Sequence, residues 1–248
     1  MPELFDKHTN KRGLIVYGGE ASDDYGIVVA EAPLFERAKR RATVFNVPGR
    51  NGSIVFQENA YDDVQRTYNV WLAPDGYFKD LAKSVNEFEA WLYSQKGYQK
   101  LEDSFEPDTF RLAYYNGGQS ISNELTQYGK TTLTFMCRPE RFYKTGETEY
   151  PLINGDTILN PTRFIAKPLI YLAGSGNISL SIGGVTIIAT VSDYIYIDCE
   201  RMNAYRLPTE NKNNQITGTF PTLKPGSNGV VLSGTVSKAT IIPKYYTI

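Results

Sequence analysis

The chain has 248 residues, of which 41% are hydrophobic and 21% charged, so its composition is that of a folded globular protein and excludes a disordered chain. Its 26 Lys and Arg nearly balance 27 Asp and Glu, and the net charge of −1 provides no overall field for nucleic acid or an anionic membrane. Cys137 and Cys199 are too few for a disulfide framework and fit a reducing cytoplasm, and neither a signal peptide nor a membrane span is predicted.

Strand patterns dominate the first half of the chain. Three segments alternate apolar side chains with others, which is typical of half-buried strands. Their apolar faces are Ile54 and Phe56 in "GSIVFQ", Tyr68, Val70 and Leu72 in "QRTYNVWL", and Leu133, Phe135 and Cys137 in "TTLTFMC".

One segment has helical spacing instead. Apolar residues three and four apart in "DGYFKDLAKSVNEFEAWLYSQKG" predict an amphipathic helix over about residues 77–96, with Asp75 as N-cap and Gly97 as the stop. Its apolar stripe is Leu81, Val85, Phe88 and Leu92.

A stretch rich in turn formers between Phe142 and Thr162 marks a domain boundary. We place the N-terminal domain at residues 1–148 and the C-terminal domain at 149–248. The second domain is predicted to be all-β, and "NISLSIGGVTIIAT" is a hairpin whose turn is Gly183-Gly184. The predicted fold class is therefore mainly β, with a β-sandwich-like N-terminal domain containing one long helix and a C-terminal β-sandwich.

Catalytic and metal-binding patterns are poor. His8 is the single histidine and lies in a polar arm, so neither a catalytic triad nor a His/Cys zinc site is expected. The densest acidic cluster, in "LEDSFEPDTF", has no EF-hand spacing and is read as a solvated loop; a glycosidase pair within it is kept as a third hypothesis. Its acids are Glu102, Asp103, Glu106 and Asp108. We expect no enzyme, no cofactor and no metal.

Two further clusters suit binding. The basic segment "FERAKRR" is read as a solvated or subunit-bridging segment in preference to a phosphate site; its cations are Arg37, Lys39, Arg40 and Arg41. Tyr194, Tyr196 and Tyr205 are possible sugar contacts, although aromatic residues of a β-sandwich usually pack in the core.

The closing segment "GTFPTLKPGSNGVVLSGTVSKATIIPKYY" resembles the C-terminal signature of the distal tail proteins of long, non-contractile-tailed bacteriophages. In that signature a Phe-Pro pair, a leucine, a Pro-Gly turn and an asparagine precede two strands. The corresponding residues here are Phe220, Pro221, Leu223, Pro225, Gly226 and Asn228, followed by Lys244 and Tyr245. "RAKRRATVFNVPGRNG", "FKDLAKSVNEFEAWL" and "KPLIYLAGSGNISLSIGG" extend the resemblance over nearly the whole chain.

The resemblance implies a structural protein of the virion tail tip, assembled in the cytoplasm of the bacterial host. It implies a homo-hexameric ring of N-terminal domains around a channel, with galectin-like C-terminal sandwiches outside. The implied partners are the tail tube protein, the tail-tip spike or tail-associated lysin, and the receptor-binding protein. Genome DNA would pass through the channel without specific binding, and no membrane insertion is implied. A free-standing carbohydrate-binding β-sandwich is the alternative.

Two sets of residues follow for the ring. Pro221, Pro225, Gly226 and Asn228 form a structural turn that fixes the path between strands. The expected subunit interface combines the basic segment with a mixed-charge helix face beside a large aromatic; its residues are Arg37, Lys39, Arg40, Arg41, Glu87 and Trp91.

Overall fold

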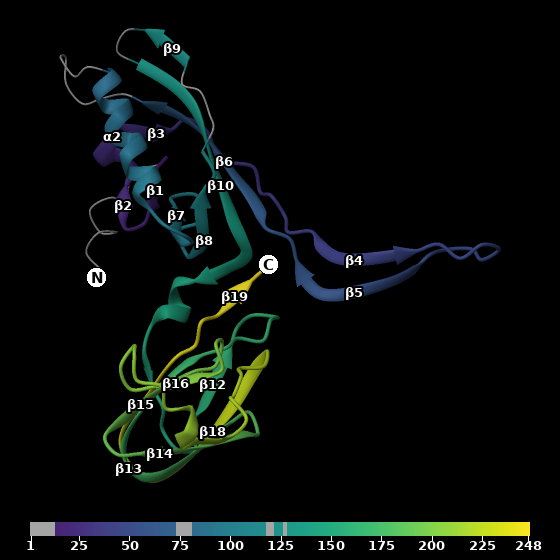
Figure 1. Cartoon of the computed structure of the whole chain (residues 1–248), viewed down its shortest axis with the longest axis vertical. Helices are drawn as coiled ribbons and strands as arrows, with labels where there is room; N and C mark the ends of the chain where they lie inside the picture. Colours follow the sequence, from purple (N-terminus) through teal and green to yellow (C-terminus); the bar gives the residue numbers. More distant parts are fainter. Residues whose placement is uncertain (1–12, 73–80, 118–121, 126–127) are drawn as a thin grey trace. The chain divides into compact units, whose positions relative to one another are not determined.

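The computed structural model describes residues 13–72, 81–117, 122–125 and 128–248 (Figure 1). It is mainly β, as predicted, with one α-helix among these residues. Contacts divide the chain into an N-terminal unit, residues 1–141 with Ile248, and a C-terminal unit, residues 142–247. The division comes earlier than the predicted boundary after residue 148, at the start of the turn-rich stretch. That the two units fold separately stays a prediction.

The N-terminal unit is built on a sheet with the strand order β2-β1-β7-β8-β10-β6-β3, and β9 and β19 also pair with β10. The strands on the main path are β1 (Ile15–Tyr17), β2 (Glu20–Ala21), β3 (Ile27–Val29), β6 (Val64–Leu72), β7 (Gln99–Asp103), β8 (Thr109–Tyr115) and β10 (Tyr128–Tyr143). The other two are β9 (Ser122–Leu125) and β19 (Tyr246–Thr247), of which β19 belongs to the C-terminal unit. A short 3-10 turn, η1 (Ser22–Tyr25), lies between β2 and β3.

The alternating patterns of β6 and β10 place the core as predicted. Tyr68, Val70 and Leu72 are at most 1% exposed, and Leu133 of β10 lies opposite Tyr68 in the ladder. Because side chains of one parity share one face of a strand, Arg66 also points inward with Tyr68 and Val70. The face of β6 that builds the core therefore carries one buried cation.

Helix α2 (Leu81–Ser94) covers this core. Phe88 and Leu92 are buried, as the apolar stripe predicts, and Val85 packs against them. Gly97 follows the helix with a φ of +68°, a left-handed conformation that suits a glycine stop. The predicted cap Asp75 and the side chain of Leu81 lie outside the part of the chain that the structure describes.

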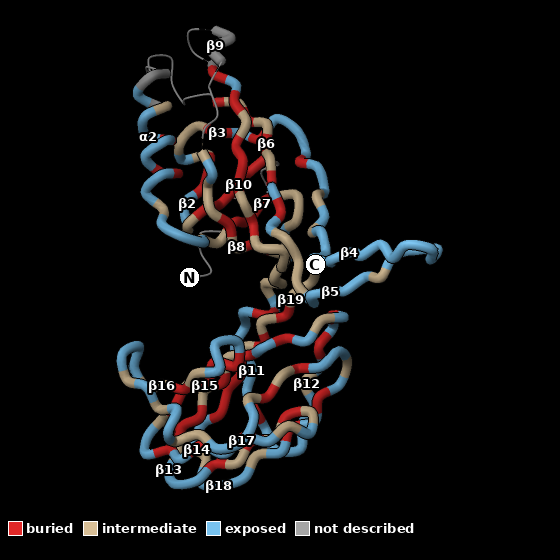
Figure 2. Tube along the Cα trace, turned by 45° about the vertical axis from the view of Figure 1, so that its right-hand side comes forward, coloured by how far each residue is buried: buried red, intermediate tan, exposed pale blue. Residues whose placement is uncertain are grey.

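β4 (Arg40–Phe45) and β5 (Ile54–Tyr61) form a two-stranded ribbon that pairs with neither large sheet. The predicted half-buried face of "GSIVFQ" is only partly right: Ile54 is half-buried, but Phe56 is 60% exposed, and Figure 2 shows exposed residues along the ribbon. The period of two correctly indicates a strand, but burial requires a second layer, and this unit supplies none to the ribbon.

The C-terminal unit contains one eight-stranded sheet in which two long strands, β13 and β18, pair along their lengths. One end of this pair carries β11, β15 and β16, and the other end carries β12, β14 and β17. Its strands are β11 (Tyr150–Pro151), β12 (Thr157–Asn160), β13 (Leu169–Ile182), β14 (Val185–Val191), β15 (Tyr194–Asp198), β16 (Asn203–Tyr205), β17 (Ile216–Gly218) and β18 (Gly226–Ile242). The 3-10 turns η2 (Lys144–Glu147) and η3 (Asn213–Gln215) complete the unit.

Glycines permit the turns and close approaches of this unit. Gly183 and Gly184 have φ of +56° and +84° and join β13 to β14, which confirms the predicted hairpin. The ladder between β13 and β18 shifts register at Gly174, where an added Cβ would lie 2.1 Å from the carbonyl oxygen of Thr235. No side chain fits there, so the two strands approach closely only because this residue is glycine.

Candidate binding surfaces

The β4–β5 ribbon carries apolar side chains on both of its faces. Phe45 and Phe56 form an edge-to-face pair with ring centroids 5.7 Å apart, and they are 52% and 60% exposed. Val44 lies opposite Val55 on the other face, and both are more than half exposed. An isolated two-stranded ribbon is at best marginally stable in water, so a surface of this kind needs something to cover it.

Basic residues brace the base of the ribbon. The guanidinium of Arg40 donates to Gln57 Oε1 (2.7 Å) and to the hydroxyl of Tyr61 (2.9 Å). Arg41 pairs with Asp62 at 2.7 Å. These contacts lie within one chain and are exposed, so each contributes little to stability. Arg40 and Arg41, two of the four predicted bridging cations, are therefore engaged within their own ribbon. Lys39 lies beside them, and its backbone carbonyl accepts the amide of Asp62.

A buried charge network lies behind the segment that leads into the ribbon. Arg66, 1% exposed, pairs with Asp103 at 3.0 Å and with Glu106 at 3.3 Å. It also donates to the carbonyl of Leu34 at 2.9 Å, which ties the approach to the ribbon to the core sheet. Burial alone lowers the pKa of Arg66, but the neighbouring Tyr68 and Asp103 raise it above its usual value.

The two central acids of the predicted acidic cluster serve this network. Asp103 accepts the hydroxyl of Tyr68 and the amides of residues 105 and 106. Glu106 accepts Arg111 and Arg141, each at 3.0 Å. These carboxylates are saturated with donors and do not face each other across an open cleft, which the glycosidase hypothesis requires. The arrangement supports a structural role for them.

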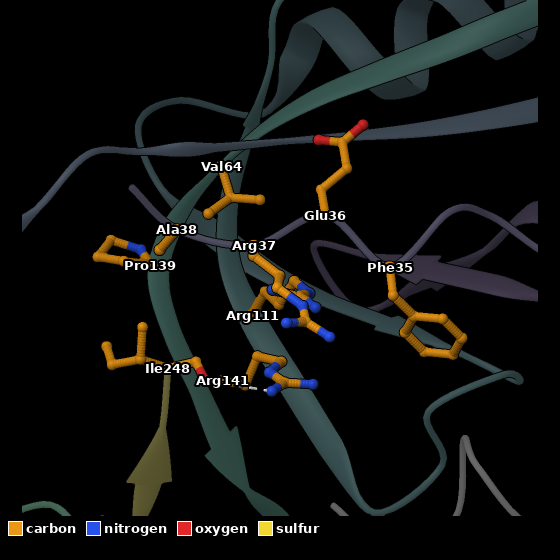
Figure 3. Close-up of a pocket in the computed structure, with 9 residues that line it drawn as sticks. All are labelled: Phe35, Glu36, Arg37, Ala38, Val64, Arg111, Pro139, Arg141 and Ile248. Atoms are coloured by element: carbon orange, nitrogen blue, oxygen red, sulfur yellow. Dashed lines mark hydrogen bonds between the residues drawn. The ribbon is translucent and has the colours of Figure 1, made fainter. Parts of the chain in front are cut away.

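A hollow of about 470 Å³ opens beside the network (Figure 3). Arg37, Arg111 and Arg141 lie along it in the close-up, and Arg141 donates to the carbonyl oxygen of Ile248 at 3.3 Å. Arg37 makes no ion pair within the described part of the chain, unlike the other two. The hollow can hold a carboxylate beside Arg37, but its remaining arginines are already engaged by Glu106 and Ile248.

The helix offers less surface than predicted. Trp91 is 3% exposed, stacks on Tyr25 with ring centroids 4.8 Å apart, and donates its indole N–H to the carbonyl of Tyr17 at 3.1 Å. Its predicted place at a subunit interface is therefore wrong, because the folded unit itself covers the ring. Glu87 is exposed and faces Lys83 at 3.9 Å, so it alone of the predicted helix pair remains available.

The predicted sugar contacts do not pack in the C-terminal core. Tyr196 lies opposite Tyr171 of β13 on one side and opposite Tyr205 of β16 on the other. Tyr194 precedes Tyr196 by two residues and therefore lies on the same face of β15. The intervening Ile195 and Ile197 point to the opposite face and are at most 1% exposed. The three predicted tyrosines and Tyr171 thus share the face turned away from the core.

The closing turn is held mainly by Asn228, which is fully buried. Its side-chain oxygen accepts the amide of Lys224 at 2.9 Å, and its nitrogen donates to the carbonyls of Lys224 and Gly226 at 2.8 and 2.9 Å. Gly226 has a φ of +85°, as a turn glycine requires. The exposed Pro225 and the buried Pro221 flank this clamp, so the motif is built for shape and presents no reactive group.

Two kinds of site are missing from the described residues. They contain no group of three or more His, Cys, Asp or Glu side chains that could hold a metal ion. No helix among them is long and apolar enough to cross a membrane. Burial raises the pKa of both thiols, Cys137 and Cys199, to about 12, so neither is an activated nucleophile.

Comparison with known proteins places these surfaces in context. Residues 28–137 match the model of the phage tail protein RIFT-related domain. The crystal structure of the SPP1 Dit (gp 19.1) protein, described as a paradigm of the hub adsorption apparatus in phages infecting Gram-positive bacteria, is 14% identical with a TM-score of 0.75. That match covers 96% of this chain and 100% of the SPP1 chain.

Chains of the phage P2 baseplate in its activated conformation also match. They are 10% identical, with TM-scores of 0.55 for the structure with Ca and 0.54 for the structure with Sr, and the matches cover 93% of this chain and 97% of theirs. A search of curated proteins finds no match. At these identities the solved structures establish the fold.

Proposed function

We propose that the protein is a structural, non-enzymatic component of a phage tail tip, because the family model and the fold confirm its resemblance to distal tail proteins. In this role the chain forms a hexameric ring that joins the tail tube to the tail-tip spike and the receptor-binding proteins. The N-terminal units surround the channel for genome DNA, and the C-terminal units are galectin-like sandwiches outside it. The ring assembles in the host cytoplasm and remains in the virion tail.

The observation that carries the ring is the β4–β5 ribbon. It exposes Phe45 and Phe56 on one face and Val44 and Val55 on the other, and its own unit covers neither face. A neighbouring copy that receives the ribbon removes these side chains from water, and each buried phenylalanine contributes about 1.5–3 kcal/mol. The ribbon then acts as an arm from one copy to the next.

An arm and its receiving surface are different patches of the same chain. Such a heterologous contact closes into a ring when a whole number of equal rotations from one copy to the next completes a full turn. The ion pairs of Arg66 with Asp103 and Glu106 and its hydrogen bond to Leu34 give the arm a rigid base, which a load-bearing ring requires. The hollow with Arg37 lies next to that base and provides a place for an acidic group of the neighbour.

Sedimentation velocity over a range of concentrations tests the ring. We expect the wild-type chain to sediment as a closed hexamer. In the double variant Phe45→Ser with Phe56→Ser, the protein concentration below which the ring dissociates should be at least about a hundredfold higher than in wild type, since two buried rings are lost from each contact. The control is Leu207→Ser with Val231→Ser, which removes two exposed apolar residues far from the ribbon in sequence.

Folding of the ribbon variant is checked by tryptophan fluorescence, because Trp91 is buried in the N-terminal core, and folding of the control, whose changes lie in the C-terminal unit, by circular dichroism. Dissociation of the ribbon variant alone supports the arm. A wild-type chain that remains monomeric at every concentration contradicts self-assembly. Rings that form equally well in both variants show that the ribbon is not the contact, and charge reversal at Arg40 and Arg41 then tests the basic base of the ribbon instead.

A further inference from the structure

The outer face of the C-terminal sheet carries a continuous row of tyrosines. Thr240 of β18, Tyr171 of β13, Tyr196 of β15 and Tyr205 of β16 lie directly opposite one another across four adjacent strands. Tyr194 lies in the next row, beyond Tyr196 on the same strand. A solvent-facing sheet surface is ordinarily polar, so three tyrosines in register with a fourth beside them on that face need an explanation.

These rings pack on one another. Tyr196 stacks with Tyr205 (centroids 5.5 Å apart, planes 19° apart), and Tyr171 stacks with Tyr194 (5.8 Å, 29°). Tyr171 and Tyr196 join the two pairs at 5.1 Å. All four side chains are half-buried, and among the described residues none of their hydroxyls has a hydrogen-bond partner. The row is therefore a pre-ordered aromatic surface with unused polar tips.

Charged and polar groups of both signs border the row. A hollow of about 310 Å³ lies at its β18 end, with Tyr171 and Tyr196 in its lining, and this volume is enough for a small ligand. Lys238 lies 5.7 Å from the centre of the Tyr171 ring and pairs with Glu149 at 3.4 Å. The hydroxyl of Thr240 hydrogen-bonds to Glu149 and lowers the pKa of that carboxyl, which keeps it an acceptor.

The opposite border repeats this pattern. Arg206 lies 5.1 Å from the centre of the Tyr194 ring and pairs with Asp193 at 2.8 Å. Each border therefore supplies one cation and one carboxylate around an aromatic floor. The pairs are largely exposed, so their side chains can turn towards a ligand at little cost.

We propose that this tyrosine face is a saccharide-binding site. A sugar ring presents a C–H face that packs on an aromatic ring and an edge of hydroxyls that needs donors and acceptors together. The tyrosine rings supply the aromatic surface for the C–H face. The tyrosine hydroxyls, together with Lys238, Glu149 and Thr240, supply the hydrogen-bond donors and acceptors. Balanced charge disfavours nucleic acid, which requires an excess of cations. Protein interfaces exclude charge from their centre, whereas here a charged pair lines the hollow.

Isothermal titration calorimetry of the full chain with three neutral probes, maltopentaose, cellopentaose and chitopentaose, tests the proposal. We expect saturable binding of at least one probe, weakened at least about tenfold by Tyr171→Ala and by Tyr196→Ala. Tyr196→Phe keeps the ring and removes only the hydroxyl, so its loss should be smaller. The matched control is Tyr150→Ala, since Tyr150 is 39% exposed in the same unit but lines a different hollow.

Unchanged melting of the variants' C-terminal units shows that a loss of binding is not a loss of fold. Binding that falls in both variants at the row but not in Tyr150→Ala supports the site. Equal binding by all variants overturns it, as does a wild-type chain that binds none of the probes. If the probes fail and Tyr196→Ala instead reduces self-association in sedimentation, the face is a contact between copies. The ring itself does not depend on this site, so the two proposals fail separately.

Discussion

Replacing Arg66 by methionine should destabilise the N-terminal unit more than any surface charge change. The guanidinium is 1% exposed and makes ion pairs with Asp103 at 3.0 Å and Glu106 at 3.3 Å, besides its hydrogen bond to Leu34. Removing one partner from a buried ion pair costs about 3–5 kcal/mol, because the remaining charge stays buried without compensation.

The partners that remain place the expected loss at the lower end of this range. Glu106 keeps Arg111 and Arg141, and Asp103 keeps the hydroxyl of Tyr68 and two backbone amides. We therefore expect the free energy of unfolding to fall by about 3 kcal/mol in Arg66→Met. The comparison is Lys83→Met on helix α2, whose pair with Glu87 is exposed and should cost at most about 0.5 kcal/mol.

Urea unfolding followed by tryptophan fluorescence measures both variants. Both tryptophans, Trp71 and Trp91, lie in the N-terminal unit, so the signal reports that unit. Arg66→Lys keeps a charge but loses the planar fork, and it should fall between wild type and Arg66→Met. A loss for Arg66→Met as small as that for Lys83→Met would refute the view that this network stabilises the sheet.

Three further outcomes are expected. Gly226→Ala should cost the C-terminal unit about 1–3 kcal/mol because of the φ of +85°, whereas Gly229→Ala, with open space and no left-handed φ, should melt like wild type in circular dichroism. Cys137 and Cys199 should resist a thiol reagent until the chain unfolds. Because folding raises the pKa of both thiols from 9.0 to about 12, they contribute stability that is complete below pH 9 and is lost as the pH rises towards 12. Urea titrations at pH 8 and pH 10.5 should therefore give a lower free energy of unfolding at the higher pH. Residues 142–248 expressed alone should melt cooperatively; a fragment without a melting transition contradicts separate domains.

Local patterns predicted much of the fold. The alternation of Tyr68, Val70 and Leu72 identified the core face of β6, and paired glycines at 183 and 184 identified the hairpin. These features depend on backbone geometry and on neighbours close in sequence, which the sequence displays directly.

The misses have physical reasons. Trp91 is three residues after Phe88 and next to Leu92, so a wider apolar stripe would have included it in the core. The ribbon has the same period of two as a buried strand, and only the missing second layer exposes it. The partner of Arg66 is 37 residues away in Asp103, a pairing that no local pattern reveals.

The tyrosine face was partly visible in the sequence. "YIYID" alternates tyrosine with isoleucine, and the β-branched residue fits the interior better, so Tyr194 and Tyr196 could have been assigned to the outside. Tyr171 and Tyr205 join them only through strand pairing. A surface assembled from three strands cannot be found from any one of them.

The long pairing of β13 with β18 sets the order in which the C-terminal unit can fold. These strands begin at Leu169 and Gly226 and hold most of the sheet together, yet dozens of residues separate them along the chain. Closing such a loop costs entropy before any contact repays it, so topologies of this kind fold slowly. During synthesis, β14 and β15 can pair with β13 at once, but the edge of β13 that pairs with β18 stays open until β18 leaves the ribosome. Chaperone dependence and low-temperature expression are the practical consequences for anyone producing this protein.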